Sequence, residues 1–341
     1  MASKIVVVTG ASAGVGRAVV RAFAARGWSV GLIARGQAGL EGARREVVSH
    51  GARALVLQAD VADAAAMDRA ADRVMAEWGR IDLWINAAMA TVLAPVSQVT
   101  PDEFRRVTEV TYLGQVFGTQ AALRHMRRQG CGTILSVGSA LAYRGIPLQA
   151  PYCGAKFATR GFFDSLRTEL LHEKSRIRVT EVHLPAVNTP QFDWARSKMP
   201  QRAQPVPPIH TPQPVAEAIY QAAMDAPREV WLAASAVKAI LGDAALPAVV
   251  DRVLASEGYD GQQTNKPATD RPDNLFHPLD VSIDYGAEGR FGDKARGSVT
   301  TWHPGRMRAA AALVIGGVAF AAVRILTRPT QRRRFSHRDY R

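Results

Sequence analysis

Residues Thr9-Gly10-Ala11-Ser12-Ala13-Gly14-Val15-Gly16-Arg17 follow an apolar, β-branched run at 4–8 and open a stretch of helical period. Glycines at these spacings let the backbone turn tightly and approach a pyrophosphate, and the free N–H groups at a helix start favour an anion. A glycine-rich turn alone is a weak signal, because many unrelated loops contain one. A strand before it and a helix after it predict a dinucleotide-binding site.

The sequence around this turn repeats the same alternation. From residue 4 to about 233, short β-branched runs alternate with segments of helical period, a pattern typical of βαβ units around a parallel sheet. The predicted fold class is α/β: a Rossmann-like, doubly wound parallel sheet with helices on both faces, plus a C-terminal extension and helix. We expect strands at 4–8, 28–34, 53–58, 82–86, 133–138, 177–183 and 229–233, and helices at 14–26, 39–50, 63–78, 101–129, 152–173 and 212–225. The fourth helix has a start signal, because Thr100 and Glu103 have capping-box spacing around Pro101.

Composition and charge exclude several classes of protein. The 341 residues are 47% hydrophobic and 21% charged, as in a globular chain with a sizeable core. The net charge is +13, but residues 301–341 hold nine arginines against one aspartate, a balance of +8 that leaves +5 for the first 300 residues. We therefore expect no nucleic-acid partner. Cys131 and Cys153 cannot build a disulfide framework, no signal peptide is apparent, and no residue cluster has metal-ligand spacing, so we expect a cytoplasmic protein without a metal.

The sequence pattern changes after about residue 255, and we divide the chain accordingly. We predict a catalytic domain over 1–255, an extended strap or linker over 256–305, a hydrophobic helix over 306–327 as a candidate membrane anchor, and a basic tail over 328–341. Fifteen consecutive apolar residues, 309–323, are marginal for a spanning helix, which needs about 20. A spanning helix, an in-plane anchor and a helix docked in an oligomer all stay open. We expect membrane-lipid contact through this segment and a homo-oligomer.

Arg35 stands at the end of the second predicted strand, where dinucleotide-binding folds read the adenosine ribose. An acid there accepts hydrogen bonds from the ribose 2′-OH of NAD, whereas an arginine accommodates a 2′-phosphate. Arg35 therefore predicts NADP(H) as the cofactor. The other interpretation is a solvated arginine at a strand end.

Tyr152 and Lys156 stand one helical turn apart on the same predicted face. A phenol has a pKa near 10, and a neighbouring cation stabilises the phenolate, so the pair can make tyrosine an acid or base at neutral pH. Ser139, just beyond the fifth strand, supplies a hydroxyl that could hold a substrate oxygen. The combination is more specific than the Tyr-x-x-x-Lys spacing alone.

With these motifs in order, residues 3–235 resemble the short-chain dehydrogenase/reductase family. The resemblance implies that Ser139, Tyr152 and Lys156 are catalytic, that Asp60 contacts the adenine, and that Thr189 contacts the nicotinamide carboxamide. The cofactor-binding set that it predicts is Thr9, Gly10, Ser12, Gly14, Val15, Gly16, Arg35, Asp60, Val61, Asn86, Ala87, Tyr152, Lys156, Pro185, Val187 and Thr189.

Two segments depart from the family pattern. The family's Asn-Asn-Ala-Gly run reads Asn86-Ala87-Ala88-Met89, and its fourth catalytic residue, an asparagine, is replaced by Thr111. In the family that asparagine maintains a helix irregularity whose carbonyl binds a proton-relaying water. A threonine can bond back to the carbonyl four residues earlier and disturb a helix similarly, so Thr111 is the candidate fourth catalytic residue. The relay is either preserved or impaired by this change.

The predicted function is NADP(H)-dependent interconversion of a carbonyl and a secondary alcohol, with Tyr152 as acid or base. The substrate is expected to be apolar, because the residues after Ser139 and those in the Pro-rich loop at 190–212 are apolar or aromatic. The alternative is a catalytically weak NADP-binding or membrane-scaffold protein that retains the fold. The expected pocket wall is Leu141, Tyr143, Ile146, Leu148, Phe192, Trp194 and Met199, of which some could instead cap the core.

Overall fold

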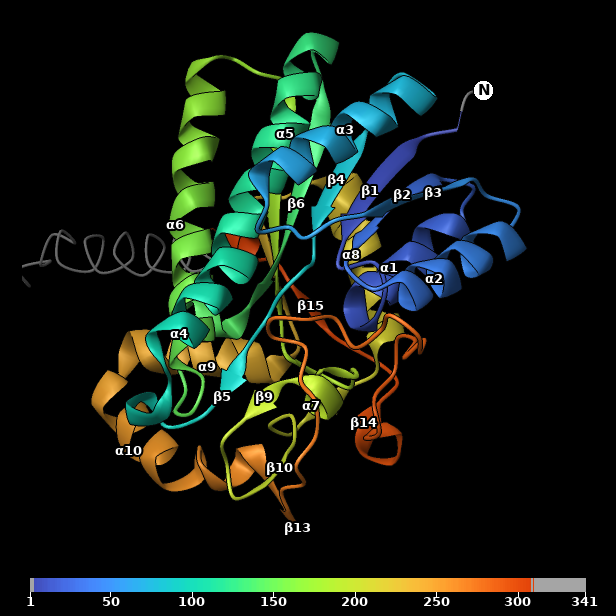
Figure 1. Cartoon of the computed structure of the whole chain (residues 1–341). Helices are drawn as coiled ribbons and strands as arrows, with labels where there is room; N and C mark the ends of the chain where they lie inside the picture. Colours follow the sequence, from blue (N-terminus) through green and yellow to red (C-terminus); the bar gives the residue numbers. More distant parts are fainter. Residues whose placement is uncertain (1–2, 308, 310–341) are drawn as a thin grey trace, which may run out of the picture. The chain divides into compact units, whose positions relative to one another are not determined.

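The computed structural model describes residues 3–307 and 309, and its centre is an eight-stranded sheet (Figure 1). Seven strands are parallel, and β15 pairs antiparallel with β12 at one edge. The strand order is β15-β12-β7-β6-β4-β1-β2-β3. The bounds are β1 Ile5–Thr9, β2 Ser29–Ala34, β3 Ala54–Gln58, β4 Leu83–Asn86, β6 Gly132–Ser139, β7 Ile177–Leu184, β12 Glu229–Leu232 and β15 Thr301–Trp302.

Helices cover both faces of this sheet. Buried side chains of α1, α2 and α8 form one apolar cluster with the sheet, and those of α3, α5 and α6 form a second cluster. The helices are α1 Gly14–Ala24, α2 Gln37–Ser49, α3 Ala64–Trp78, α4 Pro101–Thr108, α5 Gly114–Gln129, α6 Ala150–His172, α7 Gln191–Trp194, α8 Pro212–Asp225, α9 Ala234–Ala245 and α10 Pro247–Glu257.

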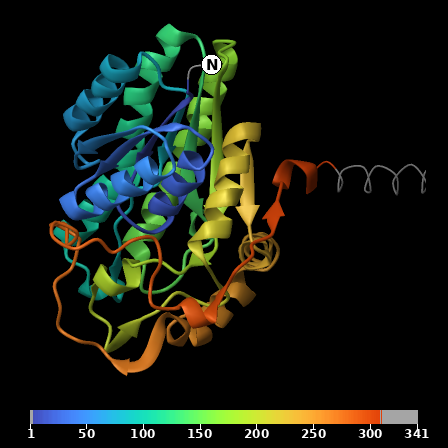
Figure 2. The same ribbon diagram turned by 90° about the vertical axis from the view of Figure 1, so that its right-hand side faces the viewer.

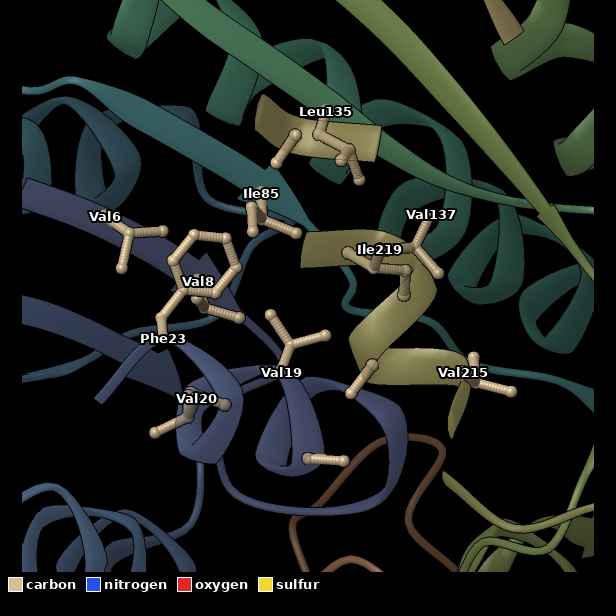
Figure 3. Close-up of a cluster of buried hydrophobic side chains, with 14 of the residues drawn as sticks. Val6, Val8, Val19, Val20, Phe23, Ile85, Leu135, Val137, Val215 and Ile219 are labelled. Atoms are coloured by element: carbon tan, nitrogen blue, oxygen red, sulfur yellow. The ribbon is translucent and has the colours of Figure 1, made fainter. Parts of the chain in front are cut away.

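Alternate residues of β1 and the inner face of α1 build the first cluster, shown in Figure 3. Val6 and Val8 face Val19 and Phe23, and all four side chains are fully buried. Each such side chain contributes roughly 1.5–3 kcal/mol relative to an exposed one. This packing fixes the start of α1 against the carboxyl end of β1, where the glycine-rich turn lies.

The predicted doubly wound parallel sheet is confirmed. All seven predicted strands and all six predicted helices are present, with ends displaced by a few residues. The predicted helix at 101–129 is interrupted by a π turn, η2 Glu109–Leu113, so it consists of α4, η2 and α5. The capping box of Thr100 and Glu103 is present, with Pro101 in the first turn. The sequence reading missed α9, α10 and several short strands.

Short segments, most of them after β7, gather at the end of the sheet where the parallel strands have their carboxyl termini (Figures 1 and 2). They form small sheets from β5 Val92–Leu93 with β9 Arg196–Ser197, from β10 Gln201–Ala203 with β13 Gln263–Pro267, and from β8 Ala186–Val187 with β11 Ile209–His210 and β14 Ala295–Arg296. Residues 273–291, named the crossing segment here, run along the same end.

Residues up to Trp302 form one compact unit, and a second unit begins at His303. The predicted boundaries at 255 and 305 stay predictions. The candidate membrane helix and the basic tail, apart from residues 306, 307 and 309, lie outside the described residues. Within the described part of the chain, no helix combines the length and apolar character needed to cross a membrane, and no three His, Cys, Asp or Glu residues are grouped to hold a metal ion.

Candidate active site

A cavity of about 520 Å³ opens at the carboxyl ends of the strands. Its wall contains most of the residues predicted for the cofactor: Gly10, Ser12, Gly14, Val15, Gly16, Arg35, Asp60, Val61, Ala87, Tyr152, Lys156, Pro185, Val187 and Thr189. Ser139 lines the same cavity. The structure therefore brings together side chains that lie as far apart in the sequence as residues 10 and 189.

Close packing explains two glycines of the turn between β1 and α1. Gly10 has a φ of +70°, and a Cβ there would lie 2.9 Å from the Ala88 backbone. A Cβ on Gly16 would lie 2.2 Å from the Gly10 carbonyl oxygen. Neither position accepts a side chain without backbone movement, and the turn is consequently held tightly against the end of β4.

The start of α1 suits an anionic group. Ser12, Ala13, Gly14 and Val15 line the cavity, and the first N–H groups of a helix have no partner within that helix. The Gly14 N–H is an exception, because it donates to the Gly286 carbonyl at 3.0 Å. This cradle, and a cavity long enough to reach from Asp60 to Tyr152, fit a nicotinamide dinucleotide.

Ser139, Tyr152 and Lys156 line the cavity together. Ser139 ends β6, and its hydroxyl accepts a hydrogen bond from the Leu141 N–H at 3.1 Å, which leaves the hydroxyl proton available for donation. A hydrogen bond also joins the side chains of Ser139 and Tyr152. The Lys156 ammonium donates to the Val137 carbonyl at 2.7 Å and lies 5.5 Å from the centre of the Tyr152 ring.

Burial controls the protonation of this group. Burial raises the pKa of Tyr152 above its ordinary value, and the hydrogen bond with Ser139 opposes that shift. Burial lowers the pKa of Lys156 to about 8, while the nearby Glu181 raises it. Burial therefore favours the neutral phenol, a form that can donate a proton.

Thr111 lies in η2 and is fully buried, but its bonding differs from the expected one. Its hydroxyl donates to the Ala90 carbonyl at 2.8 Å and accepts from the Ala90 N–H at 2.9 Å. The expected bond to the carbonyl four residues earlier is wrong, because the hydroxyl points to the segment after β4. The helix irregularity is nevertheless present at this residue.

Three predicted site residues do not line the cavity. Thr111 is one, and Thr9 is the second, since its hydroxyl accepts from the Ala87 and Ala88 N–H groups at 3.0 and 3.2 Å. Asn86 is the third: its side chain accepts from the Trp84 indole and donates to the Thr119 hydroxyl. These three residues do not face the cavity, but their hydrogen bonds stabilise the segments that form its wall.

Arg35 lines the cavity, but its guanidinium is already engaged by the crossing segment. It donates to the backbone carbonyls of Asn274, Leu275 and Phe276. The prediction of an arginine free to take a phosphate assumed no such partner. Sequence reasoning could not anticipate it, because the carbonyls come from residues some 240 positions away.

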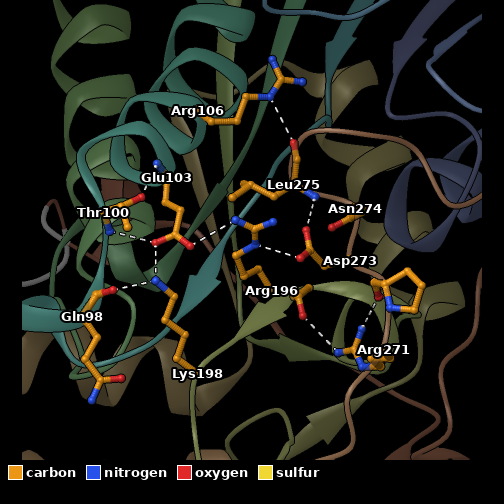
Figure 4. Close-up of polar contacts among 12 residues, drawn as sticks. Gln98, Thr100, Glu103, Arg106, Arg196, Lys198, Arg271, Asp273, Asn274 and Leu275 are labelled. Atoms are coloured by element: carbon orange, nitrogen blue, oxygen red, sulfur yellow. Dashed lines mark hydrogen bonds and ion pairs between the residues drawn. The ribbon is translucent and has the colours of Figure 1, made fainter.

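Asp60 is held in a similar way. Its carboxylate accepts from the Ala62 N–H at 3.0 Å and pairs with Arg106, which also donates to the Leu275 carbonyl at 3.1 Å. Figure 4 shows Leu275 between Arg106 and Asp273. Asp273 forms an ion pair with Arg196, and Arg196 forms a second ion pair with Glu103. Through Arg106, the crossing segment is thus fixed next to Asp60 at the edge of the cavity.

The crossing segment supplies cavity residues that the sequence reading missed: Asn274, Pro278 and Asp280. The glycine spacing at 36, 39 and 42 was the available sequence signal. Added Cβ atoms at Gly36 and Gly39 would lie 1.8 and 2.6 Å from Asp280 carboxylate oxygens, and one at Gly42 would lie 1.8 Å from an Asp284 oxygen. A glycine face on a helix start indicates close approach of another chain segment.

The other end of the cavity is mostly apolar. Leu141, Ile146, Phe192 and Trp194 line it as predicted, together with Val206, Ala239 and Leu254. The prediction was wrong for Tyr143, Leu148 and Met199. Leu148 and Met199 are buried in a small core cluster, and the Tyr143 hydroxyl bonds Glu229 behind the cavity. These three side chains stabilise the wall from its far side.

Comparison with known proteins agrees with this geometry. The family model described as short chain dehydrogenase matches residues 4–200. An uncharacterized oxidoreductase of Bacillus subtilis, YxnA, is 30% identical over 325 residues, which are 94% of this chain and 90% of that protein. The match to YxnA therefore extends through the crossing segment. A human relative, dehydrogenase/reductase SDR family member 7, is 36% identical over about half of each chain.

A curated enzyme and two solved structures are also similar. Cis-4-hydroxycyclohexanecarboxylate dehydrogenase of Sinomonas cyclohexanicum is 34% identical over 66% of this chain and 91% of its own. A short-chain dehydrogenase from Streptomyces avermitilis aligns with a TM-score of 0.62 at 28% identity, covering 75% of this chain and 99% of its own. An alcohol dehydrogenase from Thermococcus sibiricus, complexed with 5-hydroxy-NADP, aligns with a TM-score of 0.57 at 26% identity, covering 67% and 95%.

Proposed function

The chain belongs to the short-chain dehydrogenase/reductase family of oxidoreductases, and from this premise we propose that it interconverts a carbonyl and a secondary alcohol on an apolar small molecule. A bound nicotinamide dinucleotide would supply or accept the hydride. The observation that carries the proposal is the convergence of Ser139, Tyr152 and Lys156 in the wall of one cavity.

Each of the three side chains has a distinct role in this proposal. The Ser139 hydroxyl, with its own acceptor site filled by the Leu141 N–H, donates to the substrate oxygen. Tyr152 transfers a proton to or from that oxygen, and its neutral phenol can donate this proton when the carbonyl is reduced. Lys156 stands under the phenol ring and stabilises the phenolate once the proton has left.

The rival function is a catalytically weak dinucleotide-binding or membrane-scaffold protein, which the replacement of the family's asparagine by Thr111 favours. The geometry supports the enzyme instead. Thr111 bonds both backbone groups of Ala90, as an asparagine amide also can, and η2 is retained. We propose that Thr111 positions the backbone of η2 behind the catalytic group rather than contacting substrate.

A turnover assay tests the proposal. The full chain is expected to oxidise NADH or NADPH with at least one member of a panel of apolar ketones and aldehydes, and mass spectrometry of a lipid extract would then identify the product. Tyr152→Phe should reduce turnover by about 10²–10⁴-fold with nearly unchanged dinucleotide affinity. Tight dinucleotide binding without turnover on any substrate would favour the rival. Full activity of Tyr152→Phe would remove the proposed proton donor.

Two forms of the cofactor compete in this proposal. Arg35 favours NADP(H), because a guanidinium can bind a 2′-phosphate through charge-assisted hydrogen bonds. Its engagement by three backbone carbonyls favours NAD(H). Direct titration of both dinucleotides decides between them.

We also propose that the segment over 306–341 attaches the protein to a membrane, on the basis of its fifteen consecutive apolar residues and nine arginines. Retention of the full chain on membranes through high-salt and alkaline washes is expected for insertion, and release by salt indicates electrostatic attachment. A wholly soluble full-length protein would contradict the proposal. A homo-oligomer is proposed as well, and light scattering measures its mass.

A further inference from the structure

Asp280 is a buried carboxylate that faces the cavity beside the end of β2. Its side chain is 6% exposed and lines the cavity together with Ser12 and Arg35. Among residues 3–307 and 309, no hydrogen bond or ion pair satisfies either carboxylate oxygen. Arg35 attracts this carboxylate only at longer range, without a hydrogen bond. A buried carboxylate that accepts no hydrogen bond is costly, so such a group in a cavity wall is expected to serve a ligand that supplies donors.

The position of Asp280 is fixed from both sides. On its N-terminal side, Arg35 binds the carbonyls of residues 274–276. On its C-terminal side, Asp284 pairs with the fully buried Arg17 of α1 at 3.1 Å, and the Gly286 carbonyl accepts from the Gly14 N–H. Anchors on the glycine-rich turn and on the end of β2 hold the carboxylate between these two elements.

The backbone of Asp280 also contacts the start of α2. Its carbonyl accepts from the N–H groups of Ala38 and Gly39 at 3.0 and 3.3 Å. The carboxylate packs on Gly36 and Gly39, where a Cβ on Gly36 would lie 1.8 Å from its Oδ1. Because the carbonyl takes the N–H groups, the carboxylate oxygens remain for another partner.

This location is where dinucleotide-binding folds place the acid that reads the adenosine ribose, immediately after β2. The second strand of this chain ends in Ala34-Arg35 and has no acid of its own. We infer that Asp280 replaces it: the crossing segment supplies the ribose-reading carboxylate, which accepts hydrogen bonds from the ribose hydroxyls and makes the protein select NAD(H) over NADP(H). The inference rests on the proposed function, since it concerns the dinucleotide of that reaction.

The negative charge of Asp280 is the reason why NAD(H) would be preferred to NADP(H). A 2′-phosphate carries a charge of about −1.5 to −2 near neutral pH, and beside Asp280 it would meet a like charge. Arg35 does not offset this repulsion fully, because its donors are shared among three carbonyls. Arg35 instead holds the segment that carries Asp280. The NADP(H) preference predicted from Arg35 alone is thereby reversed.

Equilibrium titration of the full chain tests the inference without turnover. Isothermal titration with NAD⁺ and NADP⁺, and with the fragments 5′-AMP and 2′,5′-ADP, should show at least tenfold tighter binding of the forms without a 2′-phosphate. Asp280→Asn keeps the size and the backbone contacts and should shift the NADP⁺-to-NAD⁺ affinity ratio by about tenfold or more toward NADP⁺. Asp293→Asn, the same charge change at an exposed residue away from the cavity wall, should leave the ratio unchanged.

Each other outcome has a definite meaning. Tighter NADP⁺ binding by the wild-type chain overturns the inference without any variant, which covers the case of an unfolded Asp280→Asn protein. A folded Asp280→Asn protein with lower thermal stability and an unchanged affinity ratio also overturns it, because the carboxylate would then only stabilise the start of α2. Failure of both dinucleotides to bind would instead overturn the proposed function.

Discussion

Two walls enclose the end of the cavity that Arg35 and Asp60 line, and they are built in opposite ways. The first wall, residues 9–16 with the ends of β1 and β2, is continuous in sequence and positioned by the sheet. The second wall is the crossing segment, which has almost no regular secondary structure and is held by side-chain and carbonyl contacts. The first wall is shaped by local chain geometry, whereas the second depends on individual long-range bonds.

This difference separates two properties of the site. Backbone N–H groups and glycines of the first wall can bind any dinucleotide pyrophosphate, so they confer affinity with little discrimination. Asp280 of the second wall lies near Arg35 at the end of β2, where by our inference the group that distinguishes the two cofactors would bind. Changes in the second wall should therefore alter cofactor choice and local stability more than the chemistry at Tyr152.

Removing the Arg17 side chain, which bonds residues of both walls, should have the largest effect on stability. Arg17 is fully buried and donates to Glu46, Asp284 and the carbonyls of Ser12 and Gly39. Arg17→Met should lower the free energy of unfolding by about 3 kcal/mol, because it leaves the Asp284 carboxylate and two carbonyls without their cation and Glu46 with Arg21 alone. Urea unfolding measures this change, and limited trypsin digestion should show faster cleavage after Arg290, at the end of the crossing segment.

Arg21→Met is the matched control for that variant. Arg21 shares Glu46 with Arg17 but is about one-third exposed, so its loss should cost less than about 1 kcal/mol. Equal losses from Arg17→Met and Arg21→Met would mean that the crossing segment does not depend on the buried cation. The two walls would then be independent units.

The same contrast explains what the sequence could predict. Periodicity and the glycine-rich turn predict the strands, the helices around them and the positions of Ser139, Tyr152 and Lys156, because these depend on local pattern and on the parallel topology. The environments of Arg35 and Asp280 depend on contacts between residues about 240 positions apart; the glycines at 36, 39 and 42 indicate a close approach but not which segment makes it. Similarly, α9 and α10 are apolar without clear strand or helix boundaries, and Tyr143 was placed in the pocket because the sequence does not show its bond to Glu229.

Thr111 tests whether the segment after β4, which packs on Gly10 of the first wall, relies on specific side-chain bonds. Thr111→Val preserves shape but removes both partners of the buried Ala90 backbone, which should lower the free energy of unfolding by about 2 kcal/mol. Thr111→Ser keeps the hydroxyl and should recover most of that loss. Thr111→Asn should fold and preserve or raise turnover. A folded but inactive Thr111→Asn protein would assign Thr111 a role other than bonding Ala90.

The smallest expected changes in stability come from two helix glycines, one in a crowded position and one in an open position. At Gly42 a Cβ would meet an Asp284 carboxylate oxygen at 1.8 Å, whereas at Gly161 of α6 nothing lies within 4 Å. Gly42→Ala should therefore destabilise the protein by about 1–2 kcal/mol through displacement of the crossing segment, and Gly161→Ala should stabilise it by about 0.5–1 kcal/mol through helix propensity. Opposite shifts of the thermal midpoint are expected. If Gly42→Ala is stabilising as well, Asp284 does not pack on α2, and the second wall lacks the anchor that places Asp280.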